Sequence, residues 1–460
     1  MERQSNDRLA TLLAESGWSH AGLAKRVDDE CRRRGFPRSY TATSAANWLS
    51  GMVPIEPVPH VLAQLFTERL GRPITLDELG YEEAIPLDLG LVWGATTRAT
   101  VATVAELWRV DMQRRAVLLG SAWIATVFAT PTREWLLDWR EDDTAHTGNR
   151  RVGAAEVDVV WSMCDAFDIA DRRLGGGYGR TTLVHYVNQV VLPLLEGTYS
   201  ETMGRSLLAA TARLCDLAGF MAFDSGAQAL GQRYYVQALR LAQASRDRAL
   251  GAHVLGDMAM QAHYVGNPGE ASALARAGQR AAEQSGSYST LARCCAMESR
   301  AHARQGDDRQ CGRAMTRAEQ ALERVQAEDE PPWIRFFNAT ALHAEFAYAA
   351  ADLGRSDDVR AFAPAVLADS DEMERRRMLV TATLASSYLT SPHRGSATVD
   401  VDRACATLVE AVPLVQILTS KRCVEAVNQV RRQLVPYRDQ EPVRELESTF
   451  GPLIRAAQRP

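Results

Sequence analysis

The chain has 460 residues, of which 46% are hydrophobic and 24% are charged; this composition is typical of a folded protein with more than one domain. Its 52 basic and 57 acidic residues give a formal net charge of −5, which excludes general binding of polyanions by the whole chain. Any contact with nucleic acid must therefore come from a local basic patch. The eight cysteines include no Cys-x-x-Cys motif, and no signal-peptide pattern opens the sequence. A reducing cytoplasm is the expected location.

Apolar residues recur with helical spacing along the whole sequence, and the alternating pattern of a half-buried strand is almost absent, so an all-α fold is predicted. Four short helices are predicted in residues 1–81. The first ends at Gly17, a C-cap residue, and the second begins after Ser19, a good N-cap. A third follows Thr41 or Thr43, and an amphipathic fourth completes this segment.

The second and third helices have the pattern of a helix-turn-helix domain, in which a short reader helix enters the major groove and the preceding helix braces it. In the candidate reader, residues 44–51, Trp48 and Leu49 are expected to face the core, while outward polar side chains contact bases or phosphates. Five basic residues lie between Arg26 and Arg38. The predicted DNA-binding residues are Lys25, Arg26, Arg32, Arg33, Arg34, Arg38, Tyr40, Thr41, Thr43, Ser44 and Asn47.

Residues 82–150 are expected to form a helical connector that ends in a polar loop. Within it, the longest apolar run of the chain, Ala116 to Ala129, is about 14 residues, shorter than the roughly 20 needed to span a membrane. A buried helix is predicted there, and no membrane contact is expected. Helices resume at Ala154. The glycine-rich segment Leu174 to Arg180 is predicted to be a turn between helices, because it lacks the flanking signals of a P-loop or dinucleotide-binding turn.

The third segment, residues 151–460, contains an internal echo that is clearest in residues 211–370. Each copy has a helix, a glycine, a polar turn and a second helix. The glycines, spaced by 40, 40 and 48 residues, are Gly226, Gly266, Gly306 and Gly354. Helical hairpins bury their apolar faces by stacking, so this pattern resembles tetratricopeptide repeats, with an irregular helical bundle as the alternative. The predicted fold is thus an N-terminal helix-turn-helix domain followed by a tetratricopeptide-like α-solenoid.

Polar residues at helical spacing on the repeat helices indicate a concave groove for a peptide or small ligand, the alternative being a packed or solvated face. The candidate groove residues are Arg233, His253, Asp257, Gln261, Arg293, Met297 and Arg300. His253 and Asp257 alone do not make a metal site, since a third ligand is needed. No metal or other cofactor is expected. No nucleophile or metalloprotease motif is present in the sequence, so no enzymatic activity is expected.

A set of short motifs extends over most of the chain. They comprise Gly17-Trp18-Ser19, Leu23-Ala24, Tyr40-Thr41, Thr43-Ser44, Trp48-Leu49, Gly51, Pro54, Leu70 to Thr75, Leu79-Gly80, Asp111, Arg114-Arg115, Gly175 to Gly177, Ala218 to Met221, Asp224, Gly226, Gln232 to Tyr235 and Gln237 to Leu239. Taken together, this set resembles actinobacterial regulators that have an Xre/Cro-like N-terminal domain and a tetratricopeptide-like C-terminal domain. Some of these regulators restrain sporulation and antibiotic production.

The resemblance implies a cytoplasmic transcriptional regulator of differentiation or secondary metabolism, associated with the nucleoid when bound to DNA. It implies binding of double-stranded operator DNA as a homodimer, and sensing of a peptide, metabolite or protein through the repeats. Two departures from the family pattern favour an alternative, a repeat adaptor that binds a partner protein and no DNA. Ile55 and Glu56 stand where the family carries a basic residue, and the outward positions of the reader offer no base.

Overall fold

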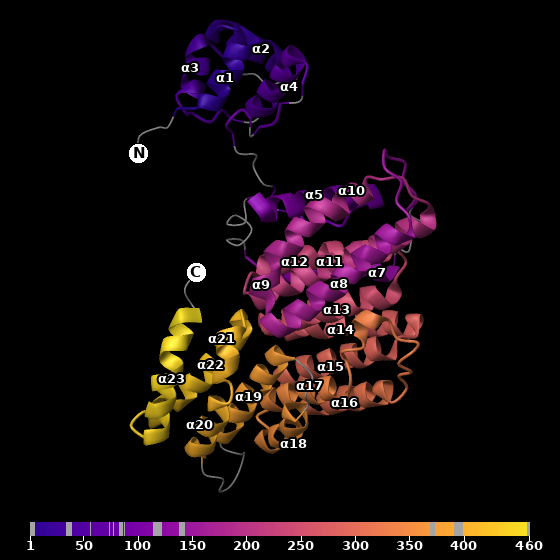
Figure 1. Cartoon of the computed structure of the whole chain (residues 1–460), viewed down its shortest axis with the longest axis vertical. Helices are drawn as coiled ribbons and strands as arrows, with labels where there is room; N and C mark the ends of the chain where they lie inside the picture. Colours follow the sequence, from indigo (N-terminus) through magenta and orange to yellow (C-terminus); the bar gives the residue numbers. More distant parts are fainter. Residues whose placement is uncertain are drawn as a thin grey trace. The chain divides into compact units, whose positions relative to one another are not determined.

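The computed structural model describes residues 5–33, 39–55, 57–72, 74–76, 78–81, 86, 88–113, 122–137, 143–368, 373–390 and 399–457. Over these residues the regular structure is helical, apart from two isolated β-bridges (Figure 1). The predicted all-α fold is confirmed. The chain divides into two compact units, Met1–Leu87 and Asp88–Pro460.

The N-terminal unit contains the four helices that the sequence predicts. They are α1 (Asp7–Ser16), α2 (His20–Arg33), α3 (Ala42–Leu49) and α4 (Val58–Leu70). The predicted caps are also present. Gly17 ends α1 in the left-handed region, at φ +70°, where glycine carries no steric cost. The Ser19 hydroxyl accepts a hydrogen bond from the Gly22 amide at 3.1 Å, and Thr41 is the N-cap of α3.

One core holds these four helices together. It includes apolar side chains from every helix and from the segment that follows α4, up to Tyr81. Trp48 of α3 is 3% exposed, and Leu49 packs against the same core while half-buried. Helix α2 packs directly on α3, so the expected pairing of a bracing helix with a short following helix is present. The apolar face of α3 packs on this core, so the polar face of α3 points outward.

The second unit begins with helices that precede the repeats. They are α5 (Thr97–Gln113), the 3-10 helix η1 (Ala125–Phe128), α7 (Ala129–Leu137), α8 (Ala154–Leu174), α9 (Gly176–Tyr186), the π-helix η2 (Val187–Val191) and α10 (Leu192–Leu195). Residues 88–113, 122–137 and 143–150 of the expected connector lie in this unit. Helices α5 and α7 both pack on α12 (Gln228–Ala244), a helix of the repeats.

The apolar run Ala116 to Ala129 is not the continuous buried helix that the sequence predicts. Residues 116–121 lie outside the described part of the chain, and residues 122–124 are not helical. The reason is visible at Ile124, whose backbone N–H donates to the Gln232 side chain at 3.1 Å and whose carbonyl accepts from it at 2.7 Å. These bonds satisfy the peptide groups of Ile124 without a helix.

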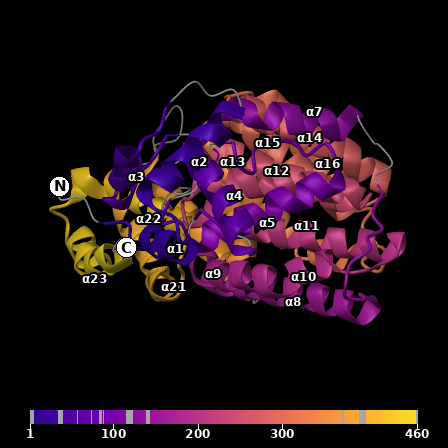
Figure 2. The ribbon, with the colours of Figure 1, turned by 90° about the horizontal axis from the view of Figure 1, so that it is seen from above.

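Consecutive helices then stack as hairpins from α11 to α20 (Figure 1). They are α11 (Glu201–Asp224), α12 (Gln228–Ala244), α13 (Arg248–Tyr264), α14 (Pro268–Ser285), α15 (Tyr288–Arg304), α16 (Asp308–Leu322), α17 (Ala339–Asp352), α18 (Ser356–Leu367), α19 (Glu374–Leu389) and α20 (Val401–Val409). Seen from above (Figure 2), α8 to α11 lie along one side of this unit and α14 to α16 along the other. The array is the solenoid-like arrangement that the sequence predicts.

The turns of the first repeats recur every 20 residues. At Gly226, Gly266 and Gly306 the backbone φ is positive, as it is at Gly286. Between α12 and α13 the same position holds Arg246, at φ +63°. Arginine thus takes the glycine position at one of these five turns, and the structural period is 20 residues, half of the 40-residue glycine spacing noted in the sequence.

The longer spacing before Gly354 has a structural cause. Between α16 and α17 the chain makes a long connection that contains the 3-10 helix η3 (Pro332–Ile334). Beyond α20 come α21 (Val412–Ile417), α22 (Lys421–Leu434), the 3-10 helix η4 (Val435–Tyr437) and α23 (Glu441–Ala457). These elements share a core with α19 and α20.

Helix α11 is the one helix of the described chain that is long and apolar enough to cross a membrane, by length and composition. Its apolar window is 89% buried by the rest of the protein. A helix at the centre of a stacked array has the same composition, because neighbours cover it on several sides.

Candidate functional site

The first helices of the hairpins face a pocket of about 120 Å³ on the inner side of the repeat array. Helix α8, the connection between α16 and α17, and α22 complete its wall. Its arginines are Arg172, Arg213, Arg293, Arg375, Arg376 and Arg422. Its carboxylates are Asp168, Asp171, Asp257 and Glu345. Its aromatic residues are Phe220, Phe336, Phe337 and Tyr348. Such a mixture of apolar walls and convergent polar groups is typical of ligand pockets.

Ion pairs between buried groups hold the α8 and α11 side of the pocket. Arg213 of α11 contacts Asp168 of α8 at 3.0 Å and Asp216 of its own helix at 2.6 Å. Arg172 pairs with Asp168 at 2.6 Å and its guanidinium stacks on the Phe336 ring, 3.8 Å from the centroid. Because unpaired buried charge is costly, these matched pairs fix the side chains in place.

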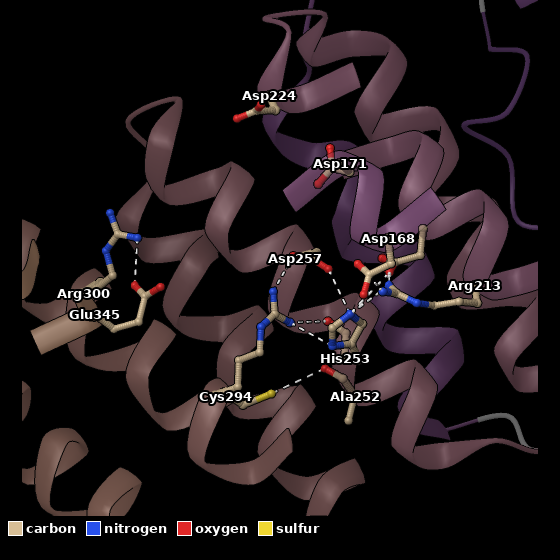
Figure 3. Close-up of polar contacts among 12 residues, drawn as sticks. Asp168, Asp171, Arg213, Asp224, Ala252, His253, Asp257, Cys294, Arg300 and Glu345 are labelled. Atoms are coloured by element: carbon tan, nitrogen blue, oxygen red, sulfur yellow. Dashed lines mark hydrogen bonds and ion pairs between the residues drawn. The ribbon is translucent and has the colours of Figure 1, made fainter. Parts of the chain in front are cut away.

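His253 of α13 lies at the centre of this network (Figure 3). The Arg213 guanidinium is 3.2 Å from its Nε2 atom, and the Arg293 guanidinium is 3.3 Å from its Nδ1 atom. Arg293 also donates to the Asp257 carboxylate and, at 3.0 Å, to the His253 carbonyl. Burial, together with the two guanidinium groups, lowers the pKa of His253 well below its usual 6.5. The imidazole is therefore neutral at pH 7.

Three of these groups have the geometry of metal ligands. Ligand atoms of Asp216, His253 and Asp257 all lie within 4.8 Å of one another. Asp216 is thus the third candidate ligand, which the spacing of His253 and Asp257 does not reveal. However, Arg213 and Arg293 already pair with both carboxylates. A divalent cation at this point would meet two guanidinium cations. The expectation that no metal binds stays a prediction.

Asp224, the last residue of α11, links the helices that precede the hairpins to those that follow them. Its fully buried carboxylate accepts from the Gly176 amide at 3.1 Å and from the Ser420 hydroxyl at 2.9 Å. Arg375 bridges it to Asp171, with distances of 3.3 Å and 2.7 Å. One carboxylate thus connects the junction of α8 and α9 with α19 and α22. This closure completes the pocket wall.

The glycines at 175–177 serve this closure. The turn predicted over Leu174 to Arg180 is confirmed only at Gly175, because Leu174 ends α8 and Gly176 to Arg180 already belong to α9. An added Cβ on Gly176 would lie 2.5 Å from the Met221 carbonyl oxygen and 2.7 Å from its Cα. The Gly177 amide donates to the Thr419 carbonyl at 3.0 Å. Glycine is therefore needed here for close backbone approach.

The structure brings some of the predicted groove residues together and separates others. His253, Asp257 and Arg293 line the pocket. Arg300 lies at its edge, where it pairs with Glu345 at 3.0 Å, and Met297 is buried in the packing of α15.

Two predicted groove residues lie elsewhere. Arg233 of α12 donates to the carbonyl of Leu89, in the segment that covers α12. Gln261 is eight residues after His253 on α13, which turns it about 80° around the helix axis. Its side chain donates to the Gln228 carbonyl at 2.9 Å and accepts from the Trp123 indole at 3.2 Å.

Several pocket residues are not among the groove residues predicted from the sequence. They are Asp168, Asp171, Arg172, Arg213, Phe220, Phe336, Phe337, Glu345, Tyr348, Arg375, Arg376 and Arg422. A signal for one of them exists in α11, where Arg213 and Asp216 interrupt a long apolar run. A charged pair inside a buried helix indicates a partnered polar site. The contributions of α19 and α22 depend on long-range packing that no local pattern indicates.

The candidate reader α3 presents few polar groups outward. Thr43 is exposed and Asn47 is half-buried. The Ser44 hydroxyl accepts from the Thr41 amide at 3.2 Å, so it takes part in capping the helix. Tyr40 is half-buried, with its ring 5.7 Å from that of Trp48.

Among the predicted basic residues, Lys25 is exposed on α2. The Arg26 guanidinium stacks on Trp18, 4.6 Å from the ring centroid. Arg32 pairs with Asp28 at 2.8 Å and Arg33 with Glu30 at 2.7 Å, which reduces their net positive field. The predicted DNA-binding residues Arg34 and Arg38 lie outside the described chain, as do Glu56, Arg114 and Arg115 of the sequence motifs.

The model of one protein family, described as the SP15 N-terminal domain, matches residues 9–82. This match coincides with the residues that build the core of the N-terminal unit, from Leu9 to Tyr81. No curated protein is similar enough to the chain to match it.

Proposed function

We propose that this protein is a ligand-responsive transcriptional regulator. Its N-terminal unit binds operator DNA through α3, two copies of the chain act as a homodimer, and the repeat unit binds an effector in its inner pocket. The sequence resemblance to actinobacterial regulators of differentiation and secondary metabolism is part of this proposal, as is action in the cytoplasm.

One observation carries the proposal. A small unit with a bracing helix and a short following helix occurs in the same chain as a solenoid whose inner face has a pocket with apolar and charged walls. The first is an arrangement suited to the major groove, and the second is suited to a small ligand. A dimer would place two readers about 34–36 Å apart, the separation of half-sites one helical turn apart.

A gel-shift titration against the DNA upstream of the protein's own gene, repeated over a salt series, tests the DNA-binding part. Asn47→Ala is expected to weaken specific binding by about 1–3 kcal/mol, the value of one base contact. Lys25→Ala is expected to weaken binding to all sequences and to reduce the salt slope by about one. Thr11→Ala, at an exposed position of α1, is the control. Unchanged binding by both test variants would exclude α3 as the reader.

A second candidate function is a repeat adaptor that binds a partner protein and no DNA. It is favoured by the ion pairs that occupy Arg32 and Arg33. It is also favoured by an exposed apolar group after α3, formed by Met52, Val53 and Ile55, of which Val53 is 66% exposed. A pull-down from lysate with and without nuclease distinguishes the two functions. A partner retained after nuclease treatment, without any DNA shift, selects the adaptor.

A further inference from the structure

Arg422 is a pocket arginine whose hydrogen bonding is incomplete. Its side chain is 11% exposed, and its closest carboxylate is Asp224 at 3.6 Å, a distance too long for a hydrogen bond. Asp224 already accepts from Gly176, Ser420 and Arg375. Within the described chain, the buried Nε of Arg422 has no acceptor. A largely buried guanidinium with unused donors is suited to an added anion.

The charge of the pocket points in the same direction. Its lining has six arginines and four carboxylates. Asp216, Asp224 and Arg300 pair with this lining. Arg422 supplies one incompletely bonded guanidinium, and one positive charge matches a monoanion better than a doubly charged phosphate.

The walls next to Arg422 are apolar and aromatic. Its guanidinium lies 4.6 Å from the Phe223 ring centroid and 6.0 Å from that of Phe220, and Arg375 lies 4.6 Å from the Phe220 centroid. Leu217, Met260 and Leu379 line the same space. Its volume of about 120 Å³ is close to the roughly 150 Å³ of a cavity that accepts benzene. The enclosed part therefore fits one ring or a short acyl chain.

We propose that the pocket binds a small organic carboxylate, whose carboxylate group accepts hydrogen bonds from Arg422 and whose short acyl or single-ring body lies against Phe220. This inference names the chemical class of the effector, and in that sense it rests on the proposed sensing function. Arg422 is the residue that selects the anion, and the aromatic and aliphatic walls select its size.

Isothermal titration of the full-length protein, without DNA, tests the inference with phenylacetate and hexanoate as probes. Phenylacetate is expected to bind at least about tenfold more tightly than phenylacetamide, a neutral compound of the same shape, because the amide is uncharged and offers Arg422 one acceptor oxygen in place of two. Phenyl phosphate is expected to bind more weakly than phenylacetate. Failure of both carboxylates to bind at up to about 10 mM, or equal binding of the amide, overturns the proposal.

Two variants and a control complete the experiment. Arg422→Gln is expected to remove the preference for phenylacetate over phenylacetamide. Arg403→Gln changes an exposed arginine of α20 that stacks on Tyr388 at 4.8 Å outside the pocket, and it should bind like the wild type. If Arg422→Gln does not fold, Leu379→Trp, which fills the pocket, should abolish binding of phenylacetate. An unchanged preference for phenylacetate in Arg422→Gln, or binding of phenylacetate by folded Leu379→Trp, contradicts the site. Since the titration contains no DNA, ligand binding is measured independently of DNA binding. A failed gel shift therefore does not affect the titration, and a failed titration does not affect the gel shift.

Discussion

At the scale of single residues, the unusual feature of this protein is how many full charges it buries. Arg213, Asp216, Asp257 and Arg293 are each less than 5% exposed. Buried ion pairs add little net stability, but the loss of one partner leaves a charge in a medium that solvates it poorly. The network is therefore sensitive to single substitutions and tolerant of paired ones.

Arg293→Met tests this sensitivity. It leaves the Asp257 carboxylate without its closest cation, so we expect a loss of about 3–5 kcal/mol in the free energy of unfolding. The double variant Asp257→Leu, Arg293→Met should recover much of that loss, because no unpaired charge remains. Urea titrations of the wild type and both variants supply the values. A single variant within about 1 kcal/mol of the wild type would show that the pair is not matched as described.

His253 makes stability depend on pH. Its pKa in the folded state lies well below the 6.5 of the unfolded chain, so the unfolded state binds more protons below about pH 6.5. Stability should therefore fall as pH falls through that value, by up to about 1.4 kcal/mol per pH unit.

The comparison is between the free energies of unfolding at pH 7.5 and pH 5.5 for the wild type and His253→Gln. The variant should have the shallower pH dependence. It keeps the contribution of His263, whose pKa burial also lowers. The raised pKa of Asp257 has the opposite sign, because the folded state then binds more protons between the usual 3.8 and the raised pKa. Since both proteins contain Asp257, the comparison isolates the contribution of His253. Equal slopes for the two proteins would contradict a buried neutral His253.

At the scale of elements, glycine positions determine where helices end and where they touch. Gly176→Ala would place a Cβ against the Met221 backbone, which cannot move without moving α11. We expect a loss of about 1–3 kcal/mol in the free energy of unfolding, measured by urea titration. Gly312→Ala is the matched control, because Gly312 lies inside α16 with open space around it. It should stabilise the protein by roughly 0.5–1 kcal/mol.

Most element boundaries could be predicted from the sequence because local chemistry sets them. Gly17, Ser19 and Thr41 act within one turn of the helix that they cap. The prediction failed at residues 122–124, where the Gln232 side chain, distant in sequence, bonds the backbone of Ile124. Tertiary bonds of this kind override local helical preference.

The pocket could be predicted only in part, for a similar reason. His253 and Asp257 share one helix face, so their spacing reveals them. Phe336 reaches the pocket because the connection before α17 is long, and the 48-residue spacing of the repeat glycines was the visible sign of it. Arg422 comes from a helix outside the repeats, and its position depends on packing across the whole unit.

At the scale of the whole molecule, the two units have separate cores. Among the described residues, the core of residues 9–81 includes none beyond Tyr81. We therefore expect a fragment of residues 1–87 to fold alone, with helical circular dichroism and one cooperative thermal transition. A fragment without a cooperative transition would show that this unit needs the repeats for its stability.

The closure at Asp224 has a consequence for how the repeat unit unfolds. An open array loses its terminal repeats one by one, because each repeat contacts only its neighbours. Here hydrogen bonds join Thr419 to Leu174 and Ser420 to Asp224, across 245 and 196 residues of chain. Because these bonds join the two ends, neither end can unfold locally without losing its contacts with the other. The unit should therefore unfold in one cooperative transition and fold slowly. The pocket lies beside these joining residues, so a bound ligand would stabilise both ends of the unit together.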